Sequence, residues 1–488
     1  MHILHSIFDN KLQRYLYVND CYDLKRNVNS ILKKCMNVDD SYKFQYVVYY
    51  ATEFNKKINL KIKGKNNTSP LLYAMNCEKD VVSMLLDYAI KKNVKIDINK
   101  KNNDGDYILL KIMNMDVYCV EQLFDYAAKI NSVLELNDAN HQGEYPFLMA
   151  CTKDNSEILR SLIKYANEHH ITLKFTDINN SNGRYPLLEA ITNSNENTVE
   201  LIIEYANKNN VILDINSFDE KGNYPFKEAV RNNKIDVLNI LEAYATTKNI
   251  ELKFNEDTVD GIYPLDYAFS NENKTIVDYV INYGEQRNTV LKMGEPFTSL
   301  KYPLLMLFKN NNMELITIML KYAMKYKIKL YINHQDQLEG YYPFLLATMS
   351  NNIELIKLLI DYANELDINI EINKSDGEQH YPFLEAIIQE NLEILRLIID
   401  YAESRNILLE INRENDWGHY PLTAIFYKQN KEMADTLFKY TLKHKIYLRF
   451  NQKDIKLNEN TENTNEDFLF EIEEKVKQNN ANLYNKTK

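Results

Sequence analysis

Few residues of this chain have the types and spacing that a catalytic or metal site needs. His169 and His170 are the one local pair with ligand-like chemistry. They fall at the end of an expected helix with no further ligand nearby, so we interpret them as a solvated loop pair rather than a zinc site. A carboxylate also precedes a recurring tyrosine in several places, namely Asp87, Asp125, Glu204, Asp361 and Asp400. Because a catalytic pair would not be copied along an array, these indicate solvated helix faces.

The usual sequence motifs of enzymes are also missing. The chain has no G-x-x-x-x-G-K-S/T, no G-x-G-x-x-G and no H-E-x-x-H. Its cysteines form an odd set without C-x-x-C spacing: Cys21, Cys35, Cys77, Cys119 and Cys151. Reduced, buried thiols are the plain interpretation, and they favour an intracellular compartment. We therefore expect a non-enzymatic, cytoplasmic protein with no catalytic residues, no cofactor and no metal.

Charge and hydropathy narrow the classes of partner. The formal net charge is -11, which disfavours nucleic acid and anionic membranes because phosphate binding needs a basic face. Residues 1–65 are an exception, with 12 Lys/Arg against 6 Asp/Glu, but no nucleic-acid motif accompanies them and we interpret them as a solvated basic end. No apolar run approaches the length of a membrane-spanning helix, and the start does not have the form of a secretory signal.

A repeat in the sequence predicts the secondary-structure elements that would position any site. Prolines recur every 38 to 40 residues, except for one frame where Ile108 takes the place of proline; the positions are Pro70, Ile108, Pro146, Pro186, Pro225, Pro264, Pro303, Pro343, Pro382 and Pro421. A tyrosine follows each by 18 or 19 residues, at Tyr88, Tyr126, Tyr165, Tyr205, Tyr244, Tyr283, Tyr322, Tyr362, Tyr401 and Tyr440. A fixed period in this range is typical of a solenoid of stacked supersecondary units.

Each unit consists of three predicted pieces. A short helix starts at Tyr-Pro, because proline is favoured in the first helical turn, as in 382–388. A longer helix follows, as in 353–363, with apolar residues three and four apart. The third piece alternates at i, i+2 and i+4, as in Ile368, Ile370 and Ile372, which predicts a short strand. A polar turn then places a glycine at positive φ. The landmark tyrosines are expected to pack, with each phenol reaching a partner at the rim.

The repeated frame resembles the ankyrin repeat. The segment D/N-x-x-G-x-Y-P-L-x-x-A matches the first half of that repeat with Tyr-Pro-Leu/Phe in place of Thr-Pro-Leu-His, and Glu354–Ile360 matches its second helix. The unit is about six residues longer than the usual 33, and Tyr-Ala replaces the glycine that normally ends the second helix. The resemblance implies a mainly α fold, an ankyrin-like α-solenoid of stacked helix pairs with a short strand/finger hairpin in each repeat.

The frame divides the chain into three parts. Residues 1–50 contain helical segments without the Tyr-Pro signal and are expected to form atypical N-terminal capping helices. Residues 51–450 form the repeat array. Residues 451–488 begin with a polar stretch expected to be disordered, followed by a helix around 468–476 that caps the last repeat or docks elsewhere. Capping is the favoured role because the final unit otherwise leaves an apolar face open.

In ankyrin-like proteins, partners are bound mainly by the finger turns and the end of the first helix. The corresponding residues of the earlier units are polar, for example His141, Gln142 and Glu144. The last three full units instead carry apolar and aromatic residues, so we predict the partner-binding patch there, centred on the only tryptophan: Tyr341, Met349, His380, Ile388, Trp417, His419 and Tyr427. The alternative is that these residues merely pack against neighbouring fingers or the tail.

The resemblance therefore implies a protein-binding scaffold or adaptor that presents an extended concave surface to a protein partner and is itself a monomer. One alternative is the substrate-recognition subunit of a ubiquitin-ligase-type or other enzyme assembly, acting through the N-terminal segment. Residues 1–50 are too few for an ordinary catalytic core. A second alternative is a mechanical spacer with no specific partner.

Overall fold

The computed structural model describes residues 27–152, 156–175, 183, 185–193, 196–256, 259, 261–293, 302–450 and 466–486. Two compact units divide the chain, Met1–Val259 and Asp260–Lys488. Both are built from helix pairs, which confirms the mainly α solenoid fold. The polar stretch expected to be disordered, residues 451–465, and residues 1–26 of the expected N-terminal cap lie outside the described residues.

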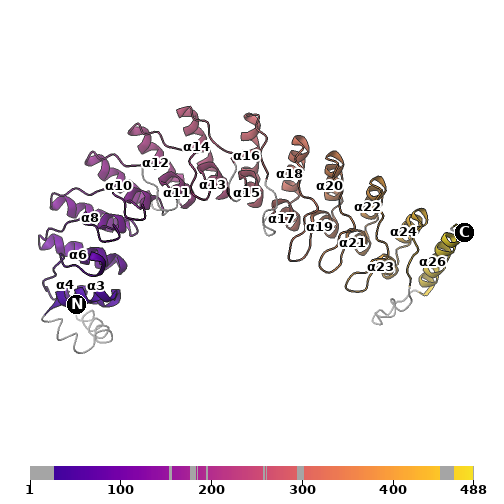
Figure 1. The fold of residues 1–488 in the computed structure, drawn as a ribbon, viewed down its shortest axis with the longest axis horizontal. Coiled ribbons are helices and arrows are strands. Elements are labelled where there is room, and N and C mark those ends of the chain that lie inside the picture. The colour runs from indigo at the N-terminus through magenta and orange to yellow at the C-terminus, as the bar shows by residue number, and fades with distance from the viewer. Residues whose placement is uncertain are drawn as a thin grey trace. The chain divides into compact units, whose positions relative to one another are not determined.

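In the described part of the N-terminal unit, helices α3 and α4 come before an alternation of short and long helices. In Figure 1 its longer helices line up side by side in one row, with the shorter helices in a second row. Its elements are α3 Val28–Val38, α4 Ser41–Glu53, η1 Lys65–Asn67, α5 Pro70–Tyr73, η2 Ala74–Asn76, α6 Lys79–Lys91, α7 Ile108–Ile112, α8 Val117–Lys129, α9 Pro146–Cys151, α10 Ser156–Glu168, α11 Pro186–Asn193, α12 Glu196–Lys208, α13 Pro225–Arg231 and α14 Ile235–Lys248.

The C-terminal unit repeats the same alternation, and its described residues also include helix α26, which lies outside the repeat frame. Its elements are α15 Pro264–Ser270, α16 Lys274–Gln286, α17 Pro303–Lys309, α18 Met313–Tyr326, α19 Pro343–Met349, α20 Ile353–Glu365, α21 Pro382–Ile388, α22 Leu392–Ser404, α23 Pro421–Lys428, α24 Lys431–His444 and α26 Glu466–Lys486. Figure 1 shows the long helices α16 to α24 in one row and the short helices α15 to α23 in the other.

Local sequence explains where each helix begins. Pro382 occupies the first turn of α21, where its missing N–H needs no partner, and Tyr381 before it is extended. Asn391 caps α22 by accepting a hydrogen bond from the Ile394 N–H at 3.0 Å. The buried face of α22 then consists of apolar residues and the landmark tyrosine, namely Ile394, Leu395, Ile398, Ile399, Tyr401 and Ala402. The long helix continues past Tyr-Ala and ends at Ser404.

The alternating third piece is extended but does not form a strand, so this part of the sequence prediction was wrong. Over the described residues no segment is assigned as a strand. Side chains satisfy the backbone groups that a neighbouring strand would bond. In the segment at 369–371, Asn333 Nδ2 donates to the Asn369 carbonyl at 2.7 Å, and Asn333 Oδ1 accepts from the Glu371 N–H at 3.0 Å. The N–H between them, on Ile370, donates to the Tyr401 hydroxyl at 2.8 Å.

Both landmark tyrosines are buried and bond to extended segments, which confirms that they are packing residues. The tyrosine of the long helix contacts the extended segment of the preceding repeat; Ile96 N–H, for example, donates to the Tyr126 hydroxyl at 2.8 Å. The tyrosine before proline contacts the extended segment that ends its own repeat, where the Tyr342 hydroxyl donates to the carbonyls of Glu371 and Lys374, both at 3.0 Å. The long-helix tyrosine therefore fixes each repeat to the one before it, and the tyrosine before proline holds together the two ends of its own repeat.

The C-terminal helix α26 packs on α24 in the place where another long helix would stand. Its apolar residues Phe468, Ile472, Val476 and Leu483 are buried. Asn480 Oδ1 accepts from the Leu448 N–H at 3.0 Å, as the landmark tyrosine does in the repeats. Lys475 of α26 also pairs with Asp435 of α24 at 2.8 Å. These contacts support the predicted capping role.

Candidate protein-binding surface

The predicted patch residues form two columns along the last three repeats. Tyr341, His380 and His419 each precede a Tyr-Pro pair, whereas Met349, Ile388 and Tyr427 each stand at the end of a short helix, on α19, α21 and α23. We call the surface formed by these columns and the adjoining finger turns the finger face. Because the short helices and fingers of successive repeats stack in register, the columns are continuous within this unit.

Exposure differs among the seven residues. Trp417 has 64% of its surface exposed. Five more are partly exposed, and these are Tyr341, Met349, Ile388, His419 and Tyr427. His380 is buried, with 6% exposed. The structure therefore leaves six of the predicted residues accessible, while His380 supports the patch from below instead of presenting its ring to solvent.

The finger turn that carries Trp417 is held by one asparagine. Asn415 Oδ1 accepts from the Trp417 N–H at 3.1 Å and from the His419 N–H at 2.9 Å, the side-chain-to-backbone pattern that stabilises tight turns. Gly418 has φ of 79°, as predicted, a conformation that glycine adopts without a steric penalty. A short, fixed turn thus projects the indole from the finger.

Ring contacts connect Trp417 to the rest of the patch. Its indole meets the His380 imidazole edge to face, with centroids 4.9 Å apart. His380 Nδ1 lies 3.1 Å from Asp376 Oδ2, so the imidazole is fixed from the opposite side. His419 and Tyr427 also meet edge to face, at 5.8 Å. The alternative expectation was that the patch residues pack against neighbouring fingers, and the Trp417–His380 contact is packing of that kind. Most of the indole nevertheless remains exposed.

Buried charge lies beneath these rings. Glu385 of α21 is 5% exposed, and its pKa is raised by burial and by the Asp376 carboxylate, against the opposing effect of His380. Burial, followed by repulsion from His380, lowers the pKa of His419. At neutral pH His419 is therefore an uncharged imidazole on the finger face, suited to hydrogen bonding or ring packing rather than to charge pairing.

Tyr341 is held differently from the histidines of its column. The ammonium of Lys309 lies 5.5 Å from the Tyr341 ring centroid and pairs with Asp336 at 3.1 Å and Glu339 at 3.2 Å. The cation therefore lies over the ring and between two carboxylates of the same finger. This arrangement fixes the ring while leaving it partly exposed.

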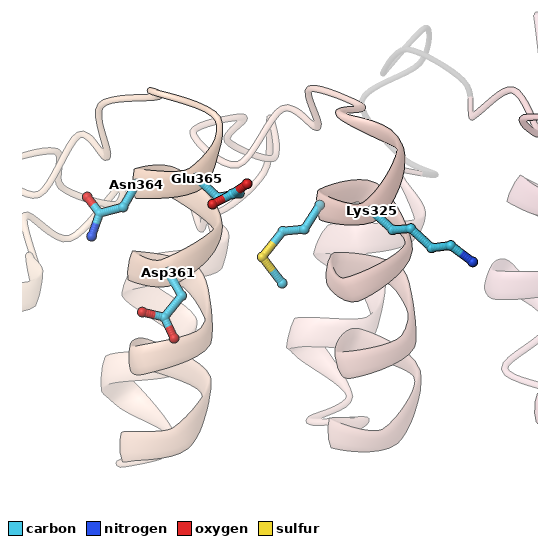
Figure 2. A pocket seen from close by; sticks show the side chains of 5 residues that line it. Lys325, Asp361, Asn364 and Glu365 are labelled. Atoms are coloured by element: carbon cyan, nitrogen blue, oxygen red, sulfur yellow. The ribbon is translucent and has the colours of Figure 1, made fainter.

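Among the described residues, open depressions lie between neighbouring long helices on the opposite face. One lies between α18 and α20 and is lined by Met324, Lys325, Asp361, Asn364 and Glu365. Figure 2 shows Lys325 pointing away from α20, in keeping with its 2.7 Å ion pair to Glu285 of α16. The lining groups do not converge on one point, so this depression does not form a chemical site.

The described part of the chain can be compared with the requirements of a metal site and of a membrane-spanning helix. Within those ranges no three His, Cys, Asp or Glu side chains are grouped so that they could hold a metal ion. Neither does any helix there have the length and apolar content required to cross a bilayer. The carboxylates that precede the landmark tyrosines are exposed, as expected of solvated helix faces: Asp87, Asp125, Glu204, Asp361 and Asp400.

Sequence reasoning missed several exposed residues beside the patch. Leu338, at a finger tip, is 80% exposed, and Glu378 and Asp416 occupy the tips of the next two fingers. The sequence could have indicated them, because each lies between the Asp or Asn of the turn and the Tyr-Pro pair that follows. The inter-repeat role of the recurring asparagines was also missed, although their fixed position after the alternating residues could have indicated it.

Comparison with known proteins agrees with this architecture. A family model described as ankyrin repeats (3 copies) matches residues 108–211 and 149–253, all within the N-terminal unit. No curated protein matches the chain. The family model therefore shows ankyrin repeats in this chain, and the stacked helix pairs with finger turns are consistent with them.

Proposed function

We propose that this protein is a non-catalytic scaffold or adaptor that holds a protein partner against the finger face of its last three full repeats. Ankyrin repeats generally mediate protein–protein interaction, which supports the general role. The single observation that supports the location is Trp417, 64% exposed on a turn fixed by Asn415. Exposed, rigidly held tryptophans are enriched among the residues that dominate protein interfaces.

The surrounding residues add to this argument. Tyr341, Met349, Ile388 and Tyr427 offer partly exposed apolar or aromatic surface along one direction. Scattered exposed apolar residues are ordinary on protein surfaces, but two continuous columns beside an exposed indole form a patch, and patches of this kind mark interaction sites. We propose that an extended partner segment follows the columns across the three repeats.

The test is affinity capture with the full-length chain. Replacing Trp417 and Tyr341 with alanine should abolish capture of the partner without lowering the melting temperature, because both side chains contribute little to the folded core. Tyr42→Ala is the matched control, since Tyr42 is an equally exposed aromatic residue of the N-terminal unit, at 69%. Capture that survives the double substitution rejects the proposed surface.

We also propose a cytoplasmic location and a monomeric state. The described cysteines Cys35, Cys77, Cys119 and Cys151 are free thiols, which supports a reducing compartment. Helix α26 covers the end of the last repeat, which removes an apolar face that a second copy would otherwise cover. Sedimentation of the purified chain at several concentrations tests the monomeric state. An apparent mass that rises towards that of a dimer with increasing protein concentration would contradict it.

A further inference from the structure

The tips of the last three fingers form a continuous row. Gly377 N–H donates to the Glu339 carbonyl at 2.8 Å, and Asp416 N–H donates to the Glu378 carbonyl at 3.2 Å. A Cβ at Gly377 would lie 3.2 Å from the Glu339 carbonyl oxygen, so the absence of a side chain permits this close approach. The backbone bonds hold the tip residues Glu339, Glu378 and Asp416 beside one another.

This row combines exposed carboxylates with exposed apolar side chains. The side chain of Glu378 is 64% exposed, and Asp416 is exposed as well. Among the described residues, no Lys or Arg forms an ion pair with either carboxylate. Leu338 and Trp417 lie directly beside the row and are 80% and 64% exposed. The Glu339 carboxylate pairs with Lys309, and Glu378 lies 4.0 Å from His380 Nδ1. The row is therefore an apolar surface on which Glu378 and Asp416 carry negative charge without a Lys or Arg partner.

We propose that the partner segment bound by this row is cationic, an extended stretch of a protein that carries Lys or Arg side chains. The inference rests on the proposed function and specifies its partner chemistry. One cation would lie over the Trp417 indole, the aromatic ring that attracts cations most strongly. Glu378 and Asp416 would flank it as charge partners.

Charge complementarity excludes the competing occupants. An acidic segment would place its carboxylates against Glu378 and Asp416, neither of which is paired with a Lys or Arg among the described residues. Nucleic acid would meet the same repulsion, and the chain as a whole has a formal net charge of -11. A purely apolar segment would cover Leu338 and Trp417 but would desolvate the two carboxylates without a partner, which is costly.

The repeat spacing sets the length of segment required. Successive helix layers lie roughly 10 Å apart, so three finger tips span on the order of 20 Å. An extended chain advances about 3.3 Å per residue, and about six or seven residues therefore cover the row. Alternate side chains of such a segment point to the same side, so cations at every second position would face the fingers.

The experiment titrates the full-length chain with two synthetic peptides of about ten residues, one alternating Arg with Ser and one alternating Glu with Ser. Trp417 is the only tryptophan, so tryptophan fluorescence reports on the row itself. We expect a saturable change with the Arg peptide and none with the Glu peptide. Since the contacts are exposed, raising the salt from about 50 to about 300 mM should weaken binding several-fold.

Charge-neutral variants separate a specific row from general attraction to an acidic protein. Glu378→Gln with Asp416→Asn should weaken Arg-peptide binding roughly 5-fold to 20-fold, since each exposed ion pair contributes about 2-fold to 5-fold. The matched control is Glu354→Gln with Asp361→Asn, two exposed carboxylates on the long helix α20. This pair should leave affinity within about 2-fold.

Two results would overturn the inference: equal binding of the Arg and Glu peptides, or equal loss of affinity in the row variant and the control. Either result leaves the proposed function standing if Trp417→Ala with Tyr341→Ala still abolishes capture of the partner. Capture that survives that double substitution rejects the proposed surface itself, so the two failures are distinguishable.

Discussion

The finger faces of the two units differ although the repeats beneath them are built alike. In the N-terminal unit the positions before Tyr-Pro are polar and internally bonded: Asp106 pairs with Lys111 at 2.9 Å and accepts from Asn140 Nδ2 at 2.9 Å. In the C-terminal unit the corresponding positions are Tyr341, His380 and His419, which make ring contacts instead. The comparison shows that the scaffold is constant and that the variable finger positions distinguish one face from the other.

The constant part consists of residues that connect repeats. In both units a long-helix tyrosine accepts a backbone N–H of the preceding repeat, at 2.8 Å for Tyr126 and 2.8 Å for Tyr401. Asparagines complete the same pattern, with Asn99 contacting Val133 and Glu135 as Asn333 contacts Asn369 and Glu371. Substitutions at these positions should therefore act alike in the two units, whereas substitutions on the finger faces should not.

The largest expected effect is loss of a tyrosine before the short helix. Tyr107 and Tyr381 are both fully buried, and each hydroxyl donates to two carbonyls in the extended segment that ends its repeat. Replacing either with alanine should lower the free energy of unfolding by about 3–5 kcal/mol, measured by urea denaturation. A cost confined to one unit would show that the two scaffolds are not equivalent.

A smaller effect is expected when only the phenol oxygen of the long-helix tyrosine is removed. Tyr126→Phe and Tyr401→Phe keep the ring but leave the N–H groups of Ile96 and Ile370 buried without an acceptor. Each should lose about 1–3 kcal/mol, with amide exchange accelerated at those two residues. Unchanged exchange at both amides would contradict the inter-repeat role of the hydroxyl.

Two buried glutamates of the short helices, Glu385 and Glu228, should respond differently to replacement by glutamine. Burial raises the pKa of Glu385 above 4.5, so between 4.5 and its raised value the folded state binds more protons than the unfolded state. Stability from this group is therefore lost as pH rises through that window. Glu385→Gln should be more stable than the parent at pH 7 and should flatten the pH profile.

The corresponding residue of α13 provides the contrast. Glu228 pairs with Arg231 at 3.2 Å and accepts from the Thr192 hydroxyl at 3.2 Å. Glu228→Gln should cost about 1 kcal/mol at pH 7, since it weakens charge-assisted contacts. Urea denaturation of Glu385→Gln and Glu228→Gln at pH 7 tests this contrast. A change in the free energy of unfolding in the same direction for both variants would contradict it.

The smallest effect on stability is expected when a finger residue of the C-terminal unit is replaced by the residue at the matching position of the N-terminal unit. Asn223 Nδ2 donates to Asp219 Oδ2 at 3.0 Å, in the place where His380 Nδ1 contacts Asp376. His380→Asn should keep that hydrogen bond and change the free energy of unfolding by less than about 1 kcal/mol. Because the indole loses its ring neighbour, the fluorescence of Trp417 should shift; an unchanged spectrum would contradict the ring contact.

Periodicity predicted the repeat, its two helices and the buried tyrosines, because burial against identical neighbours requires the same residue types at every step. It also predicted positive φ at the finger glycines, including Gly340 and Gly418. Alternation at Ile368, Ile370 and Ile372 failed to distinguish a strand from an extended segment bonded by side chains, since both bury every second residue. The column of exposed residues was found by position, but the burial of His380 depends on Asp376 and Trp417, which only the fold brings together.

The most direct test of the partner-binding surface is amide hydrogen exchange of the full-length chain with and without its captured partner. The account predicts protection in the fingers at 335–341, 375–380 and 414–419 and unchanged exchange in the fingers at 102–106, 140–144 and 219–223. Protection of the N-terminal fingers with none around Trp417 would contradict it.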